Sequence, residues 1–226
     1  SDDPICAGVF LPDLDVPATP TEGHFIRSHF AAPQISSTDW SLPVSGDVDN
    51  PLDLSYADLL KLPSHEIVSL MECAGNSRST MQPPAEGVQW DNGAVSVACW
   101  KGVSVKTVLE KASLKEVAAD VLFEGIDHGT ERYSRHTLNY AMSVPLEKVL
   151  HPDTILAFEM NGETLPKDHG YPIRLLVPGW YGMTSIKWLV GIHVLDHEFK
   201  GFYQTERYMT LNGPDADSYY TYLTAM

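Results

Sequence analysis

A cysteine stands where a strongly apolar segment meets a tight polar turn. Residues 67–72 are rich in apolar and β-branched side chains and predict a half-buried strand. The sequence Cys-Ala-Gly-Asn-Ser-Arg follows at residues 73–78. Gly75 and Asn76 both tolerate positive φ, so the chain can bend sharply there. Positive neighbours such as Arg78 lower a thiol pKa and favour the thiolate, which binds metals or attacks electrophiles. Cys73 is therefore a candidate metal ligand or nucleophile, and the alternative is an inert buried cysteine.

Two cations lie inside segments that are otherwise apolar. Arg174 lies within residues 172–177 and Lys187 within residues 185–190, and we predict strands over 174–177 and 186–194. A buried, unpaired cation is costly, so each needs an anion nearby. Two partners are open: one of the 30 Asp and Glu residues, or a bound phosphate recognised by guanidinium and ammonium donors.

Zinc is the rival metal for a cysteine site. It needs four ligands, or three and an open position. His193 and His197 are four residues apart, but in a strand-like run they need not converge. The three cysteines are widely spaced, with no CxxC pair and no CxxCH haem attachment sequence; the spacing permits a disulfide between Cys6 and Cys99 but does not indicate one.

Composition excludes several classes of function. The 226 residues suffice for one large or two small domains, and 43% hydrophobic content predicts a packed core. No apolar stretch is long enough to span a membrane. Lys and Arg total 15 against 30 Asp and Glu, a formal charge of −15. This charge argues against general binding of nucleic acids or anionic membranes and favours cationic protein partners.

The elements that must position these residues are mostly short strands. Residues 1–24, rich in Pro, Asp and Thr, predict an N-terminal arm lying on a main domain of residues 25–226. We predict an apolar element over 25–30 and further strands over 94–100, 121–123 and 155–160. Short helices are expected over 56–62, after an N-cap at Ser104, and over 146–150. Few helices and many strands predict a β-rich α+β domain.

Residues 69–100, with a cysteine followed by Ala-Gly-Asn and a nearby basic residue, resemble the molybdenum-cofactor domain of the sulfite oxidase family. The resemblance continues in order through residues 123–127, 160–163, 168–174, 177–182 and 185–188, so it covers nearly the whole chain from Phe25 to Phe202. It implies the sulfite-oxidase-type molybdopterin-binding fold and a mononuclear molybdenum cofactor. Many relatives continue into a C-terminal dimerisation domain that these residues do not contain, so this chain is expected to be a monomer.

The resemblance also implies roles for individual residues. Cys73 would be the single protein thiolate on molybdenum, the other sulfurs coming from the pterin dithiolene. Arg27 and Arg78 would draw an anionic substrate such as sulfite towards the metal. The residues expected to hold the pterin and its phosphate are Phe25, Ile26, Arg27, Ser28, His29, Asp127, His169, Arg174, Ser185, Ile186 and Lys187.

The leading functional hypothesis is oxidation of sulfite to sulfate. A separate one-electron carrier, such as a c-type cytochrome, would accept the electrons, because the chain has no haem attachment sequence. Two alternatives are open: reduction of S-oxides or N-oxides at the same site, and a cofactor-free binding module on the same fold. Bacterial relatives are commonly exported, which favours a periplasmic or otherwise extracytoplasmic location, although a cytoplasmic one would look the same here.

One position departs from the family pattern. The active-site tyrosine of the family precedes Lys-Gly-Phe, and here that position is Phe199, which has no hydroxyl. We expect either that Tyr181, Tyr203 or Tyr208 supplies the missing hydroxyl, or that the substrate differs from sulfite.

Overall fold

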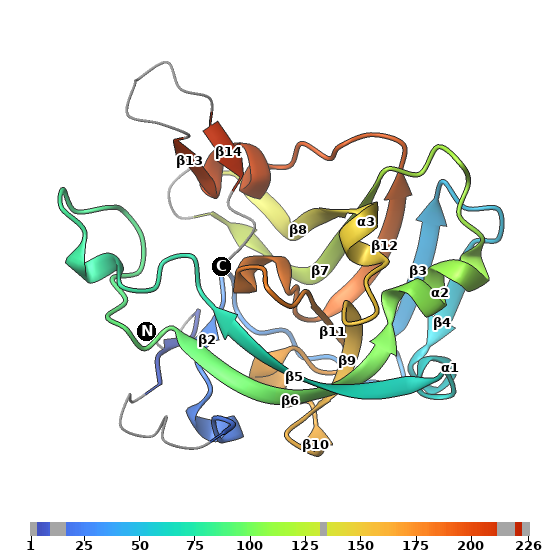
Figure 1. Ribbon diagram of the computed structural model, residues 1–226, viewed down its shortest axis with the longest axis horizontal. Helices are drawn as coiled ribbons and strands as arrows, with labels where there is room; N and C mark the ends of the chain where they lie inside the picture. Colours follow the sequence, from blue (N-terminus) through green and yellow to red (C-terminus); the bar gives the residue numbers. More distant parts are fainter. Residues whose placement is uncertain (1–3, 10–16, 132–134, 212–219, 223–226) are drawn as a thin grey trace.

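Two five-stranded sheets form the body of the protein. The computed structural model describes residues 4–9, 17–131, 135–211 and 220–222. One sheet has the order β4-β3-β12-β7-β8; the other has the order β10-β9-β6-β5, with β11 also pairing with β9 (Figure 1). The strands of the first sheet are β3 (Ser41–Gly46), β4 (Leu52–Ser55), β7 (Asp120–Thr130), β8 (Thr137–Pro145) and β12 (Leu189–Leu195). Those of the second are β5 (Ser64–Glu72), β6 (Val95–Ser104), β9 (Ile155–Met160), β10 (Glu163–Thr164) and β11 (Arg174–Leu176).

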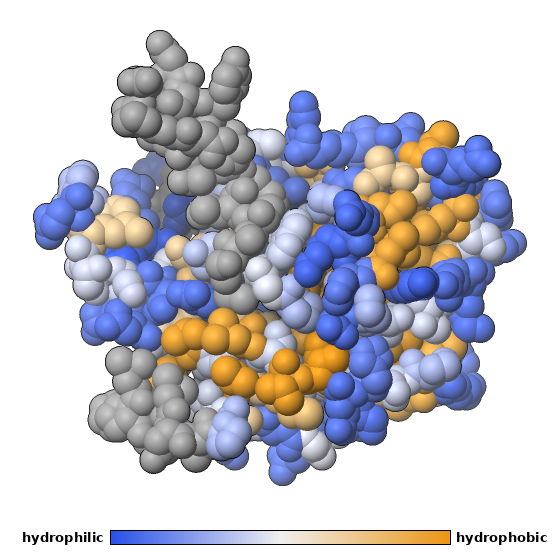
Figure 2. Space-filling model, viewed as in Figure 1, coloured by the Kyte–Doolittle hydropathy of each residue, from blue (hydrophilic) through white to orange (hydrophobic). Residues whose placement is uncertain are grey.

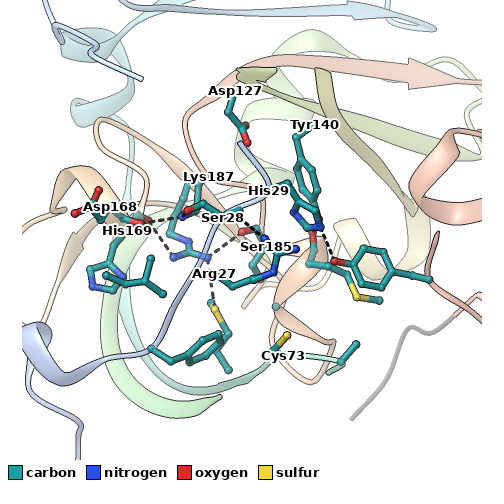
Figure 3. Close-up of a pocket in the computed structure, with 18 residues that line it drawn as sticks. Arg27, Ser28, His29, Cys73, Asp127, Tyr140, Asp168, His169, Ser185 and Lys187 are labelled. Carbon is teal, nitrogen blue, oxygen red and sulfur yellow. Dashed lines mark hydrogen bonds between the residues drawn. The ribbon is translucent and has the colours of Figure 1, made fainter. Parts of the chain in front are cut away.

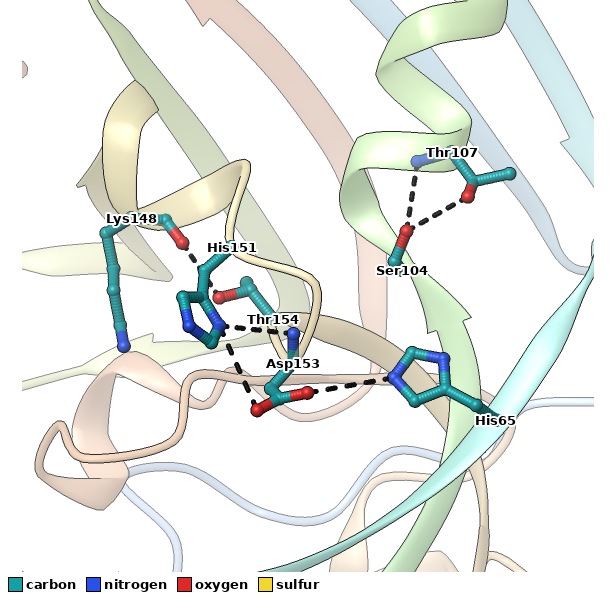
Figure 4. A network of polar contacts seen from close by, with 7 residues as sticks. All are labelled: His65, Ser104, Thr107, Lys148, His151, Asp153 and Thr154. Atoms are coloured by element: carbon teal, nitrogen blue, oxygen red, sulfur yellow. Dashed lines mark hydrogen bonds and ion pairs between the residues drawn. The ribbon is translucent and has the colours of Figure 1, made fainter.

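The short helices form where the sequence predicts them. Helix α2 (Val105–Ala112) begins after Ser104, whose hydroxyl accepts a hydrogen bond from the Thr107 amide at 3.1 Å (Figure 4). Such a cap satisfies one of the first backbone donors of a helix. Helices α1 (Tyr56–Leu60) and α3 (Leu146–Val149) complete the set, with 3₁₀ turns η2 (Thr21–Gly23), η3 (Arg78–Thr80), η4 (Lys167–His169) and η5 (Gly182–Thr184) and a π-helical turn η6 (Tyr203–Arg207). The β-rich α+β prediction is therefore confirmed.

The strand predicted over residues 186–194 is wrong in its extent. β12 begins at Leu189 instead of residue 186, so Lys187 lies in the segment before the strand. Trp188 adopts a φ of 49°, which interrupts an extended run at that point. Between residues 25 and 30, only Ile26–Arg27 form a strand, β2. Irregular backbone at both places leaves Lys187 and the residues around Arg27 outside a regular sheet.

Two apolar clusters fill the interior. The larger joins both sheets and α2. The smaller includes Met71 of β5, Trp100 of β6 and Met160 of β9, and Phe25 and Trp90 pack into it from outside the sheets. The described part of the predicted N-terminal arm also joins the body, since β1 (Cys6–Ala7) pairs with β2 and the Thr19 amide donates to the Val97 carbonyl at 2.7 Å. The boundary at residue 24 stays a prediction.

Figure 2 shows apolar side chains gathered over the paired strands β5 and β6, and a further apolar area elsewhere on the same face. Val68 and Leu70 of β5 are 70% and 44% exposed there. At the start of the same strand, the imidazole of His65 lies 4.0 Å from the carboxylate of Asp153, which His151 also faces (Figure 4). Within the described residues, no helix is long and apolar enough to cross a membrane. Another pair of strands, β13 (Met209–Leu211) and β14 (Tyr220–Tyr222), forms a separate ribbon.

Candidate active site

A cavity collects most of the residues that the sequence singled out. It has an empty volume of about 650 Å³, part of it open to solvent. Eleven of the predicted residues line it: Phe25, Ile26, Arg27, Ser28, His29, Cys73, Asp127, His169, Arg174, Ser185 and Lys187 (Figure 3). Tyr208, one of the three tyrosines considered for a hydroxyl in the site, also lines it. The sequence did not place the other lining residues there, which are Met71, Ala74, Tyr140, Asp168, Gly182 and Met183.

Cys73 is held at the cavity by the turn that follows β5. Its amide donates to the Ala94 carbonyl at 2.9 Å, and its carbonyl accepts from the Asn76 amide at 2.8 Å. The Asn76 side chain fixes the turn, because it donates to Glu72 at 3.0 Å and accepts from the Ala94 amide at 3.0 Å. The Gly75 amide points at the thiol, 3.4 Å from Sγ. The polar turn predicted from Gly75 and Asn76 is therefore present, and it presents the thiol to the cavity.

The pKa of the Cys73 thiol differs from the sequence expectation. Burial raises this pKa, and it outweighs the Gly75 hydrogen bond and the charges of Arg27 and Arg78, which act in the opposite direction. Burial disfavours the charged form of a thiol. The expectation that positive neighbours would lower the pKa is thus wrong for the thiol without a metal. A thiolate at this position needs an additional positive charge, such as a bound metal ion.

Arg78 and Ile186 do not line the cavity. The Arg78 guanidinium donates to the Val88 carbonyl at 3.1 Å. It also lies so close to Gly87, whose φ is +124°, that a Cβ there would come within 2.1 Å of Nη1. Arg78 therefore closes the loop after Cys73 and influences the cavity through its charge. Ile186 is 1% exposed and packs in the larger apolar cluster.

A group of aromatic side chains borders the cavity beside Arg27. His29 stacks on Tyr140, with ring centroids 4.7 Å apart, and its Nε2 lies 2.8 Å from the Tyr208 hydroxyl. Tyr140 is engaged elsewhere, since its hydroxyl donates to the Met183 carbonyl at 2.8 Å. Burial raises the pKa of Tyr208 to about 12, so its hydroxyl stays protonated. Arg27 donates to the Ser28 carbonyl, and neighbouring thiols and tyrosines raise its pKa.

The structure corrects the placement of Phe199. Phe199 is not among the residues that line the cavity, and its amide donates to the buried carboxylate of Asp120 at 2.9 Å. Of the three tyrosines considered from the sequence, Tyr208 lines the cavity and Tyr181 and Tyr203 do not. Of the three tyrosines, Tyr208 therefore remains the candidate for a hydroxyl in the cavity.

The other end of the cavity holds one buried cation, Arg174, and one partly buried cation, Lys187. Arg174 is 3% exposed; its guanidinium donates to the carbonyls of His169 and Ser185 at 3.0 and 2.9 Å and lies 5.0 Å from the Trp100 ring. Its Nε has no hydrogen-bond partner. Lys187 donates to the Ser28 hydroxyl at 2.6 Å and to the Asp168 carbonyl at 2.9 Å. Backbone carbonyls thus fix both cations without neutralising them.

Burial of uncompensated charge shifts several pKa values in the cavity. It lowers the pKa of Arg174 to about 9 and that of Lys187 to about 7, and it raises the pKa of Asp127 to about 6. The pKa of His169 falls to about 3, first through burial and then through its cationic neighbours. Within the described part of the chain, no carboxylate lies within 4 Å of Arg27, Arg174 or Lys187 as a salt-bridge partner. The cavity is therefore a site for an anion.

A metal site built from several protein ligands is not seen. Among the residues that the structure describes, no group of three or more His, Cys, Asp or Glu side chains is arranged to hold a metal ion. His193 donates to or accepts from the Ser45 hydroxyl at 2.8 Å, whereas His197 contacts Asp196. These two histidines do not converge, so they provide no zinc site together.

Comparisons with known proteins show the family to which the chain is similar. The profile of the family described as "Oxidoreductase molybdopterin binding domain" matches residues 29–203. Mitochondrial sulfite oxidase of Rattus norvegicus is 38% identical over 197 residues, which cover 84% of this chain and 35% of the relative. NADH nitrate reductase of Ulva prolifera is 32% identical over 200 residues, which cover 82% of this chain and 22% of the relative.

A solved structure shares the fold. The sulfane dehydrogenase SoxCD from Paracoccus pantotrophus superposes with a TM-score of 0.81 at 31% sequence identity, over 94% of this chain and 52% of that one. The β-rich fold predicted from the sequence resemblance is thereby confirmed. This chain spans between about a fifth and about a half of the length of the relatives it matches.

Proposed function

This chain belongs to the oxidoreductase molybdopterin-binding domain family, and on that premise we propose that its cavity holds a mononuclear molybdenum cofactor and oxidises sulfite to sulfate. The observation that supports this proposal most directly is the joint presence of a thiol and unneutralised cations in one cavity. Cys73 lies at one end, and Arg174 and Lys187 lie at the other. A group with a soft metal at one end and a phosphate at the other matches this distribution.

The residues present fit such a group. The Nε of Arg174 is buried without a partner, and a phosphate oxygen would satisfy it. Lys187 and the Ser185 hydroxyl are further donors on that side, and Cys73 is the soft ligand for the metal. When bound, the cofactor supplies two-electron redox chemistry that side chains lack. The chain's own residues bind it, orient it and compensate its negative charge.

Three side chains beside the thiol suit a small oxyanion substrate. Arg27 keeps its charge, and Tyr208 and His29 offer a hydroxyl and an imidazole within 2.8 Å of each other. Burial keeps His29 neutral by holding its pKa well below the usual value, with help from the charge of Arg27. A fixed guanidinium and a protonated hydroxyl would orient an anion such as sulfite and exclude neutral molecules.

Loading with cofactor tests the first half of the proposal. Purified protein from a host that makes molybdopterin should contain one molybdenum per chain and release a fluorescent oxidised pterin. Cys73→Ser should lose turnover, because the metal loses its protein ligand, whereas the matched control Cys99→Ser should keep it, because Cys99 does not line the cavity. Stoichiometric zinc without molybdenum would contradict the proposal, as would unchanged turnover in Cys73→Ser.

The substrate requires its own assay, because a relative named as a nitrate reductase keeps a reductive function open. Sulfite with ferricyanide as acceptor measures oxidation. Nitrate, an S-oxide or an N-oxide with a reduced dye measures the reverse direction. Faster turnover with sulfite than with any of these acceptors supports the proposal, and the opposite ranking favours the reductase.

Electrons are proposed to leave through a separate carrier. The formal charge of −15 favours a basic partner, such as a c-type cytochrome. Since salt screens the attraction between exposed charges, turnover with a basic cytochrome should slow as ionic strength rises, whereas turnover with the small anion ferricyanide should not. Equal salt dependence with both acceptors would contradict electrostatic docking.

A further inference from the structure

A second thiol stands beside the cavity on the same face as Arg27. β1 runs antiparallel to β2, and Cys6 is the direct partner of Arg27 in that pairing. Residues directly opposite each other in an antiparallel pair project their side chains to the same face. The Cys6 side chain therefore lies on the same face of this two-stranded ribbon as Arg27, which lines the cavity.

Cys6 and Cys73 are neighbours in one packed region. Both are partly buried, and both pack against the smaller apolar cluster, which includes Met71 and Trp90. Both thiols raise the pKa of Arg27, and Cys6 also contributes to the raised pKa of Cys73. Coulomb interactions fall with distance, so these effects agree with the placement that the strand pairing gives. The thiols of Cys6 and Cys73 therefore both lie near the guanidinium of Arg27.

The third cysteine lies on a different face. Cys99 alternates along β6 with Ala98 and Trp100, which are both 0% exposed and belong to the smaller cluster. In the β5–β6 pairing Cys99 lies opposite Val68, which is 70% exposed on the outer face. Cys6 and Cys73 both pack against the smaller apolar cluster, so the structure favours this pair over Cys6 and Cys99.

We propose that Cys6 and Cys73 form a reversible disulfide when the cavity holds no cofactor. A disulfide requires Cα atoms roughly 4.4–6.8 Å apart. β1 comprises two residues paired with a strand of two residues, so an adjustment of β1 disturbs few hydrogen bonds. The disulfide removes the thiol that is proposed to bind the metal and so closes the site to the cofactor. That consequence, but not the disulfide itself, rests on the proposed function.

Hydrogen peroxide is a sufficient oxidant for this step. One thiolate attacks a peroxide oxygen, the O–O bond breaks, and a sulfenic acid and one water form. The second thiolate then attacks the sulfenic sulfur, the S–S bond forms, and the hydroxyl leaves as a second water. The two thiols give up two electrons and two protons, and the peroxide takes both; a dithiol reverses the reaction by exchange.

The disulfide can be tested without any cofactor. Full-length protein from a host that lacks molybdopterin is reduced, desalted and treated with one equivalent of hydrogen peroxide. The number of titratable thiols should fall from three to one, because two of the three cysteines are consumed. Peptide mapping should find Cys6 joined to Cys73, and dithiothreitol should restore all thiols. Cys99→Ser, the matched control, should form the same disulfide, whereas Cys6→Ser should not.

Two results would overturn the proposal: a disulfide that contains Cys99, or peroxide-treated wild-type protein in which Cys73 is not joined to Cys6. The consequence for loading is measured separately. Reduced protein incubated with isolated molybdenum cofactor should bind it, and oxidised protein should bind it only after dithiothreitol. If the disulfide forms but reduced protein binds no cofactor, the proposed function fails and the disulfide stands. If oxidised protein loads as well as reduced protein, the closing of the site is refuted.

Discussion

The two ends of the cavity are built by different means. At the thiol end, a tight turn holds Cys73, and neutral rings around His29 carry their own hydrogen bonds. At the cationic end, Arg174 and Lys187 are fixed by backbone carbonyls and keep a charge that no carboxylate of the described chain neutralises by a salt bridge. The His29, Tyr140 and Tyr208 side chains of the thiol end have hydrogen-bond partners, and the nearby Tyr203 hydroxyl is the exception. The cationic end is satisfied only when an anion is bound, so the two ends should respond differently to mutation.

The largest difference is expected for Arg174. Replacing it by Met should stabilise the cofactor-free protein, because a buried charge without a counter-ion is removed and the volume is nearly kept. The same change should weaken cofactor binding by roughly 10²–10³-fold, since breaking a buried charge pair costs about 3–5 kcal/mol. Urea unfolding of cofactor-free protein and pterin release from loaded protein measure the two effects.

The Arg174→Met experiment is decisive because the stability of the cofactor-free protein should rise while the affinity for the cofactor should fall. A residue with a purely structural role would lose stability in both forms. The matched control is Lys101→Met, which removes a part-exposed cation paired with Glu159 at 3.2 Å on the surface of the second sheet. It should change neither pterin content nor stability beyond about 1 kcal/mol. A destabilised Arg174→Met protein with normal pterin content would refute the anion role.

The next effect concerns His24, which lies behind the cationic end. Its Nδ1 donates to the Phe25 carbonyl at 3.0 Å, its Nε2 has no partner, and the side chain is 3% exposed. Burial lowers its pKa from 6.5 to about 4. The unfolded chain therefore binds a proton first as the pH falls, so stability is complete above about pH 6.5 and is lost as the pH falls towards 4. The loss amounts to about 3 kcal/mol at 1.36 kcal/mol for each pKa unit.

Replacing His24 by Phe should remove that share of the acid sensitivity. Urea unfolding of the cofactor-free protein at pH 7 and pH 4.5 gives the difference in each protein. The surface variant His197→Phe serves as the control, because His197 is exposed beside Asp196. An equal loss of stability in His24→Phe and the wild type would show that other groups, such as His169, carry the whole effect.

A smaller effect is expected at the thiol end from Tyr208→Phe. This change removes the hydroxyl 2.8 Å from His29 and leaves the ring. A hydrogen bond to a charged group contributes about 1.5–3 kcal/mol, so kcat/KM for sulfite should fall roughly 10–100-fold. Pterin and molybdenum contents should stay normal, because the cationic end is untouched. Reduced cofactor content would mean that Tyr208 supports loading instead of substrate binding.

Site residues could be predicted from the sequence where a reactive or charged side chain stands in an otherwise apolar segment. Cys73 follows a strand and begins a polar turn, and Arg174 interrupts an apolar run, so type and position together drew attention to both. Tyr208 follows the π-helical turn at Tyr203–Arg207, and its place beside His29 depends on tertiary contacts between segments 179 residues apart. Arg78 had the expected type near the expected cysteine, but its guanidinium turns back onto its own loop. Local patterns give a residue's segment, whereas the direction of a long side chain is decided by packing.

The smallest effect is expected from Phe199→Tyr, a position that the sequence alone made prominent. The Phe199 amide is bound to Asp120, which also accepts from the Ser143 hydroxyl, so the backbone at 199 is fixed against the first sheet. The ring lies over Gly201, where a Cβ would come within 2.2 Å of it, and outside the cavity. An added hydroxyl should therefore reach neither Arg27 nor substrate, so kcat and KM for sulfite should stay within about twofold. Stability should change by about 0.5 kcal/mol at most, as is usual for substitutions away from the core and from buried polar networks.

The double variant Phe199→Tyr/Tyr208→Phe sharpens the test. If the new hydroxyl restored the activity lost with Tyr208, the segment from 199 to 208 would have to bring either residue to the same place. The hydroxyl beside His29 would then not be fixed by the fold, and the contrast between a preformed thiol end and a cationic end that needs a bound anion would no longer hold.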